Sequence, residues 1–271
     1  MGSVRINAGD RSVRGVAATL AGAVFGVLLT AYSPAGFARQ PAARTFPTPE
    51  AASAALYTAV QHEDDAAIAA ILGSDRRLVA SSDKRQDKLD RERFTEKYRQ
   101  MHRLAQEPDA SAVLYIGAEN WPFPIPLVSE SGVWHFDAKA GSEEMLFRRI
   151  GENELSAAQA CHALILAQQE NRWPEQDPSM RALERLPASA SAGGPGVEFH
   201  GYVFRSLQSG ATTSTGSAYV AYPASYGTTG VMSYLVDQDN VVYAKDLGPH
   251  TGRLAKRMRK YHPDPSWHQE D

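Results

Sequence analysis

The fold is decided by four short runs: GYVFRSL at 201–207, AYVAY at 218–222, VMSYLV at 231–236 and VVYAK at 241–245. They are rich in Tyr, Val and Phe, and small polar or turn residues separate them, which is typical of β-strands. Residues 237–240, DQDN, are the types that a tight hairpin turn needs. The C-terminal half is therefore predicted to contain an antiparallel sheet.

The N-terminal half has helical patterns before its own strand patterns. Thr48, Pro49 and Glu50 are typical of a helix start, and Gly73 is typical of a helix end. The expected helices cover 48–59, 64–72, 83–104, 142–171 with a break at Gly151, and a basic stretch at 253–260. The expected strands of this half cover 112–116 and 133–137, and the tail after Pro263 is expected to fray.

Helices followed by a sheet, twice along the chain, predict an α+β protein of two small units that meet near residue 150. The N-terminal unit would span 39–150 and the C-terminal unit 151–271. Residues 173–196 are rich in Pro, Ala, Ser and Gly, which predicts a flexible loop. With 271 residues, of which 43% are apolar, the chain can bury a core in each unit.

Residues 1–38 have the pattern of a secretory signal peptide. Three arginines precede an uncharged stretch at 16–32, and Gly36 and Ala38 place small residues at −3 and −1 of a cleavage point after Ala38. The alternative is an uncleaved inner-membrane anchor, for which an apolar stretch of 17 residues is short. We expect a periplasmic or secreted protein with no stable membrane span once the signal is cleaved.

Composition excludes several classes of function. The formal charge is −3 with a pI near 6.3, which is no electrostatic footprint for nucleic acid, and we expect no nucleic-acid partner. Cys161 is the one cysteine, so neither an intrachain disulfide nor a Cys-rich zinc site can form. Removal of residues 1–38 takes away three arginines and one aspartate, which leaves a formal charge of −5.

No catalytic constellation emerges from the motifs. Cys161 and His162 are neighbours on a predicted helix and diverge by about 100°, so the cysteine is best assigned to an apolar stripe. His135 and Asp137 share a strand face, but no nucleophile motif accompanies them. The DQDN run at 237–240 resembles the start of a calcium loop, yet the later Gly and Glu ligands are missing, and a hairpin turn explains it better. We expect no cofactor, no metal and no catalytic residue.

The best candidate for a partner surface is Trp121, with Phe123, Arg148 and Arg149 as its neighbours. Prolines occupy every second position of 121–128, WPFPIPLV, and remove ladder donors. The segment should therefore be an edge strand or an extended lead-in. A Trp among prolines is difficult to bury fully and is a frequent anchor of binding surfaces. The alternative assigns Trp121 to the core.

Five stretches resemble a family of exported bacterial proteins known as domain of unknown function 2950. They are FPTPEAA at 46–52, WPFPIPLV at 121–128, RRIGENEL at 148–155, YGTTGVM at 226–232 and VYAKDLGP at 242–249. The resemblance implies export and implies no reaction. Members of the family usually carry a longer insert after the Cys161 helix, which is compressed here into 173–196.

In layout, the N-terminal unit is similar to a nuclear-transport-factor-2-like cone, and the half from Asn153 is similar to the globular part of pilins. Such likenesses carry little about function. We therefore expect a non-catalytic binding or assembly module of the periplasm, with an envelope protein as its partner and an oligomeric state that the sequence leaves open. The alternative is a hydrolase-like enzyme with a pocket inside the N-terminal unit and His135, Asp137 or nearby carboxylates as acid and base.

Overall fold

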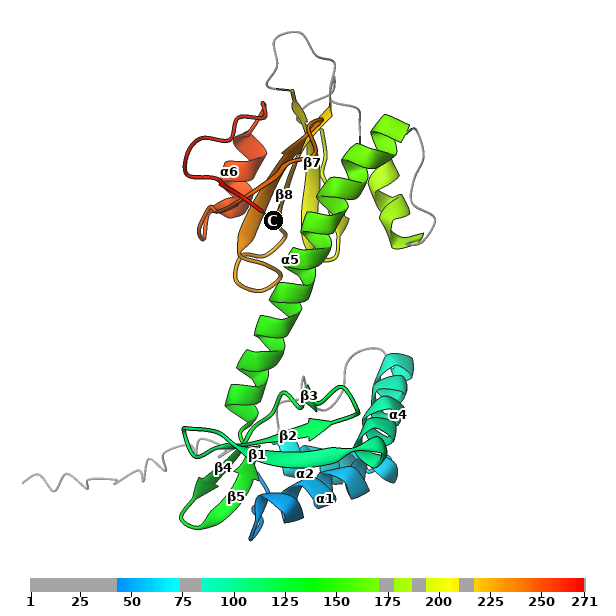
Figure 1. Cartoon of the computed structure of the whole chain (residues 1–271), viewed down its shortest axis with the longest axis vertical. Coiled ribbons are helices and arrows are strands. Elements are labelled where there is room, and N and C mark those ends of the chain that lie inside the picture. The colour runs from blue at the N-terminus through cyan, green and yellow to red at the C-terminus, as the bar shows by residue number, and fades with distance from the viewer. Residues whose placement is uncertain (1–42, 74–83, 171–177, 187–193, 210–216, 271) are drawn as a thin grey trace, which may run out of the picture. The chain divides into compact units, whose positions relative to one another are not determined.

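A computed structural model describes residues 43–73, 84–170, 178–186, 194–209 and 217–270. The expected signal peptide at 1–38 lies outside these residues. The fold is α+β, with helices and an antiparallel sheet in each half of the chain, as the sequence predicts (Figure 1). The similarity of the two halves to a nuclear-transport-factor-2-like cone and to a pilin stays a prediction.

The first two helices begin where their capping residues predict. In α1 (Pro49–Gln61), the Thr48 hydroxyl accepts a hydrogen bond from the Ala51 amide at 3.2 Å. In α2 (Asp65–Leu72), the Asp64 carboxylate accepts one from the Ala67 amide at 2.9 Å, and Gly73 ends the helix at a φ of 93°. Each side chain satisfies an amide that has no partner within its helix.

The N-terminal sheet has the strand order β1-β2-β4-β5, with β3 paired to one end of β2. Its strands are β1 (His102–Gln106), β2 (Ala112–Ile116), β3 (Trp121–Pro122), β4 (Leu127–Glu130) and β5 (Val133–Phe136). The helices α1, α2 and α4 (Lys84–Gln100) cover one face of this sheet (Figure 1). Leu56, Ile71, Leu127 and Phe136 are almost fully buried in the core between these two layers.

Two expectations for this half were wrong. The charged helix ends at Gln100, and residues 102–104, which were expected to extend it, form β1 instead. The proline-rich segment is divided rather than forming one strand: Trp121 and Pro122 pair with β2 at the edge, whereas Leu127–Glu130 lies between β2 and β5. Prolines 124 and 126 fall in the bend between the two strands, where a missing donor costs no ladder bond.

The helix α5 (Ala138–Glu170) has 33 residues and runs without the break that was expected at Gly151. Its first turn accepts a cap from Asp137, whose carboxylate receives the amides of Lys139 and Ala140 at 3.0 Å each. Near its start, Gly141 lies directly against the Ile125 side chain. Residues 157–167 pack with the C-terminal sheet, so one helix contributes to the packing of both halves.

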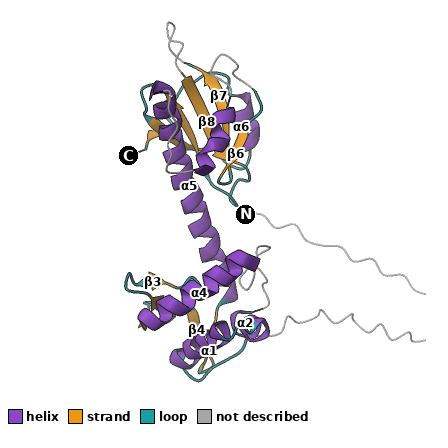
Figure 2. Ribbon diagram, turned by 90° about the vertical axis from the view of Figure 1, so that its right-hand side faces the viewer, coloured by secondary structure: helices purple, strands orange, loops and turns teal. Residues whose placement is uncertain are grey.

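The C-terminal sheet has the order β11-β10-β9-β8-β7-β6 and is antiparallel throughout. Its strands are β6 (Val197–Phe199), β7 (Tyr202–Gln208), β8 (Ser217–Pro223), β9 (Met232–Asp237), β10 (Val242–Asp246) and β11 (His268–Gln269). One face packs against α5 and the 3-10 helix η1 (Pro178–Arg185). The other face packs against α6 (Thr251–Arg257), as Figure 2 shows from a second direction.

The four strands predicted from the opening runs are all present, and β6 and β11 were not expected. The turn at 237–240 is a hairpin, in which the Asp237 carboxylate accepts the Asp239 amide at 3.1 Å. Part of the stretch predicted as a loop forms η1 instead, with Leu183 buried against the sheet. The tail after Pro263 does not fray, because Trp267 is buried and β11 pairs with β10.

Within the described residues, no helix is both long and apolar enough to cross a membrane.

Candidate functional site: the Trp121–Arg148 surface

Trp121 is held at the edge of the N-terminal sheet with 39% of its surface exposed. The strand β3 places it opposite Ile116 of β2. Its indole meets the Phe123 ring edge-on, with centroids 6.5 Å apart. The guanidinium carbon of Arg148 lies 5.1 Å from the indole centroid, which is within the range of a cation–π contact. We call Trp121, Phe123 and Arg148 the Trp121–Arg148 surface.

Arg148 is fixed in place by two further hydrogen bonds. Its Nε donates to the Glu144 carboxylate at 2.8 Å, one helical turn away on α5. Its Nη1 donates to the Pro122 carbonyl at 2.9 Å, which ties α5 to β3. A proline in β3 still offers its carbonyl, so the residue that removes a ladder donor supplies the acceptor that anchors this arginine.

Phe123 and Arg149 have different surroundings from Trp121. Phe123 is half-buried and makes edge contacts with Phe94 and Phe136, at centroid distances of 5.6 and 6.0 Å. It therefore supports the indole from the core side. Arg149 is exposed and lies about 100° further around α5 than Arg148. The structure thus brings three of the four expected surface residues together and directs Arg149 elsewhere.

A partly exposed indole under a fixed guanidinium is a preorganised contact surface. The two groups need little further ordering when a partner arrives, so little rotamer entropy is lost on binding. The indole offers apolar area and a ring N–H, and the arginine offers charge. The side chains of Trp121, Phe123 and Arg148 carry neither a nucleophile nor a general base at neutral pH.

The residues that the sequence offered for catalysis lie in the following surroundings. His135 lies on β5, while the Asp137 carboxylate is used as the cap of α5. Cys161 is fully buried, and burial raises the pKa of its thiol well above the ordinary value. The His162 ring contacts the Asn240 side chain at 3.0 Å. Among the described residues, no group of three or more His, Cys, Asp or Glu side chains could hold a metal ion.

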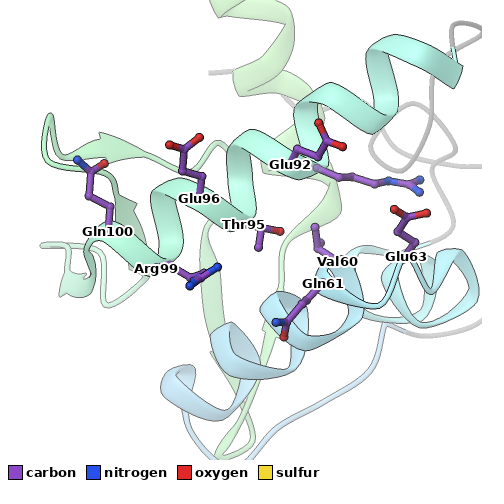
Figure 3. A pocket seen from close by; sticks show the side chains of 9 residues that line it. Val60, Gln61, Glu63, Glu92, Thr95, Glu96, Arg99 and Gln100 are labelled. Atoms are coloured by element: carbon purple, nitrogen blue, oxygen red, sulfur yellow. The ribbon is translucent and has the colours of Figure 1, made fainter.

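A separate open pocket of about 540 Å³ lies between the end of α1 and the outer side of α4 (Figure 3). Its charged lining comes from Glu63, in the turn after α1, and from Arg91, Glu92, Glu96 and Arg99 of α4. Neither His135 nor Asp137 lines it. Arg91 also forms an ion pair with Asp65 at 2.7 Å. The pocket is therefore a shallow zone of mixed charge on the helical side of the N-terminal half, and it differs from the site inside the cone that the sequence suggested.

A second cluster of contacts, which the sequence did not reveal, joins α5 to the loop before β9. One carboxylate oxygen of Glu154 accepts the amides of Val231 and Met232 at 2.8 and 3.0 Å. The Asn153 side chain donates to the Thr229 carbonyl at 2.9 Å. These partners are 76 to 78 residues apart in the chain, and no local spacing rule connects residues at that separation.

Comparison with known families supplies the classification. A family profile described as "Protein of unknown function (DUF2950)" matches residues 43–186 and 176–269, which together cover most of the chain. The chain belongs to the DUF2950 family. Neither a curated protein nor a solved structure matches it.

The resemblance seen in the sequence is confirmed by this match. In this DUF2950 protein, the first matched segment contains the whole Trp121–Arg148 surface, and the second contains the C-terminal sheet. Two of the stretches that carried the resemblance, RRIGENEL at 148–155 and YGTTGVM at 226–232, meet through Asn153 and Glu154. Hydrogen bonds thus join these two stretches in the folded chain.

Proposed function

We propose that this DUF2950 protein is an exported, non-catalytic binding or assembly module of the periplasm. The chain is exported by the signal at 1–38, is cleaved after Ala38, and acts through two α+β units that divide near residue 150. The observation that carries the proposal is the Trp121–Arg148 surface, where a large aromatic side chain stays 39% exposed although Phe123 and Arg148 contact it.

The expected partner is an envelope protein that covers the indole. Burial of a Trp in a partner pocket commonly dominates the free energy of binding, because a large apolar area leaves water at once. The fixed guanidinium of Arg148 would favour a carboxylate or a carbonyl beside that pocket. Trp121 is then the anchor, and Phe123 holds it from below.

The proposal is tested by the substitution Trp121→Ala. Its effect on stability should be moderate, about 2 kcal/mol, because it removes a cation–π contact, an edge contact and part of a half-buried side chain. Thermal unfolding gives this value, and purification of the tagged chain from its native envelope gives the set of bound proteins. That set should shrink for Trp121→Ala at a temperature where both proteins are folded.

The matched control is Ile71→Val, which removes one methyl group from the same core and costs about 1 kcal/mol. Ile71→Val should co-purify with the same envelope proteins as the wild type. An unchanged set for Trp121→Ala would contradict the proposal. So would a loss of about 3–5 kcal/mol, which is the cost of emptying a core Trp site and would make Trp121 a packing residue.

The alternative, a hydrolase-like enzyme of the N-terminal half, has one observation in its favour, which is the pocket between α1 and α4. Glu92 and Glu96 are carboxylates one turn apart, and Arg99 lies near them in the same lining. The pocket lacks histidine among its lining residues and is open to solvent, which weakens any general acid or base in it. The wild type and Glu96→Gln would be assayed against a range of ester and glycoside substrates. An activity that the wild type has and Glu96→Gln lacks would support this alternative.

A further inference from the structure

The C-terminal half carries a group of cations that we call the basic face. It consists of Arg253, Lys256, Arg257, Arg259 and Lys260. All five are exposed, and no Asp or Glu occurs anywhere from residue 247 to residue 263. This concentration of positive charge belongs to a chain whose formal charge is −3.

The cations of the basic face differ from those of α4 in being unpaired. On α4, Lys88, Arg91, Arg93 and Lys97 each form an ion pair with a carboxylate. In the part of the chain that the structure describes, no carboxylate lies within ion-pair distance of any cation of the basic face. Their charge is therefore available to an external anion.

The fold holds the basic face in one direction. In α6, Thr251 and Ala255 are buried against the sheet, so residues 253, 256 and 257, spaced by three and four, point the opposite way. The buried Arg205 donates to the Ala255 carbonyl at 3.0 Å and secures the helix.

Residues 259–261 are fixed separately. The Arg259 carbonyl accepts the Gln208 amide at 2.9 Å, and the Tyr261 amide donates to the Gln208 carbonyl at 2.8 Å. Both ends of the basic face are thus preorganised. Burial raises the pKa of the Tyr261 phenol, and the charges of the nearby Asp237 and Asp239 raise it further.

Two further features indicate the chemistry of the partner. A hollow that is open to solvent is lined by His250 together with Arg253, Lys256 and Arg257. Leu254, beside these cations on α6, is 38% exposed. A lone exposed leucine beside cations has the chemistry to contact the boundary between lipid head groups and acyl chains.

We propose that the basic face docks on a bilayer surface of anionic phospholipids. The cations would contact the head-group phosphates, the hollow would receive one head group, and Leu254 would enter the boundary of the acyl chains. This inference goes beyond the proposed binding function and is independent of Trp121. A membrane explains Leu254 as well as the charge, whereas nucleic acid would use only the charge.

The test uses the full chain with vesicles of phosphatidylglycerol and of phosphatidylcholine, separated by sedimentation. Residues 1–38 are the same in every variant, so any binding through the apolar stretch at 16–32 and the arginines before it cancels when variants are compared. Each cation near an anionic surface is worth about fivefold in partitioning. The triple variant Arg253→Gln, Lys256→Gln, Arg257→Gln should therefore lose roughly 100-fold of the preference for phosphatidylglycerol.

The matched control is Lys88→Gln, Arg93→Gln, Arg99→Gln on α4, which changes the net charge equally and should lose less than about threefold. Leu254→Ser should weaken binding and keep its salt dependence. Thermal unfolding of each variant verifies that the fold is intact. Equal partitioning of the wild type into both lipids would overturn the inference, and so would equal losses in the two triple variants. An acidic protein partner would give the first of these results.

Discussion

Removal of the Glu154 carboxylate should be among the most costly changes on the surface of α5. One carboxylate oxygen of Glu154 accepts the amides of Val231 and Met232, and hydrogen bonds to charged groups contribute about 1.5–3 kcal/mol each. Both amides belong to half-buried residues, so water can replace part of the loss. With the lower value for each bond, Glu154→Ala should reduce the free energy of unfolding by about 3 kcal/mol.

Urea denaturation followed by circular dichroism measures this loss, with an unchanged dependence on denaturant showing that stability alone has changed. Glu154→Gln keeps an acceptor oxygen without the charge and should lose about 1 kcal/mol. The control is Glu152→Ala, an exposed carboxylate on the same helix, which should stay within about 0.5 kcal/mol of the wild type. A loss below about 1 kcal/mol for Glu154→Ala would refute the assignment of Glu154 as the anchor of this loop.

Three further predictions follow from packing, burial and the N-terminal pattern. Gly230→Ala should cost about 3 kcal/mol, because a Cβ there would overlap the buried Tyr202 side chain. Gly227→Ala places its Cβ in open space and should cost about 1 kcal/mol, because only the φ of 70° is unfavourable for alanine. Urea denaturation of both variants measures the two losses. Burial raises the pKa of the Cys161 thiol, so at pH 8 the thiol stays protonated, and a thiol reagent should label it only as urea unfolds the protein. Rapid labelling of the folded protein would show an exposed thiolate instead. Cys161→Ala should cost about 1 kcal/mol. N-terminal sequencing of protein from the native envelope should find a start at or near Arg39, and an intact Met1 would rule out cleavage.

The parts of the fold that could be predicted are those encoded by neighbouring residues. Thr48 and Asp64 cap helices through amides three positions away, so the local sequence alone locates α1 and α2. The strands of the C-terminal sheet follow from runs of Tyr and Val that favour a pleated, buried surface. Cys161 was assigned to the core from the apolar residues one turn before and after it.

The parts that could not be predicted depend on tertiary contacts. The strand β1 has the sequence HRLAQ, which lacks both alternation and β-branched residues, and its pairing with β2 decides its conformation. Gly151 costs a helix about 1 kcal/mol, and the packing of α5 at both ends offsets that cost, so the helix does not break.

For the candidate site, the sequence predicted which residues take part but not how they are arranged. The prolines beside Trp121 indicated incomplete burial, and its indole is indeed 39% exposed. The contact with Arg148 joins residues 27 positions apart, and the direction of the helix decides whether Arg148 or Arg149 makes it. The sequence does not reveal which side of α5 faces Trp121, because this depends on where α5 begins after Asp137 and on how Gly141 packs against Ile125.

The distribution of core residues along the chain also sets an order of assembly at synthesis. Every buried residue of the N-terminal core between the helices and the first sheet lies between Phe46 and Phe136, so that core can close before the rest of the chain exists. The core beneath α6 includes Trp267 and must wait for almost the last residues to emerge. At a translation rate of about 5–20 residues per second, the interval between the two events is on the order of 10 s. The strands of the C-terminal sheet emerge within that interval, and their α6 side stays uncovered until residues 251–267 have followed. This half is therefore the one that depends on protection from aggregation while it is being made.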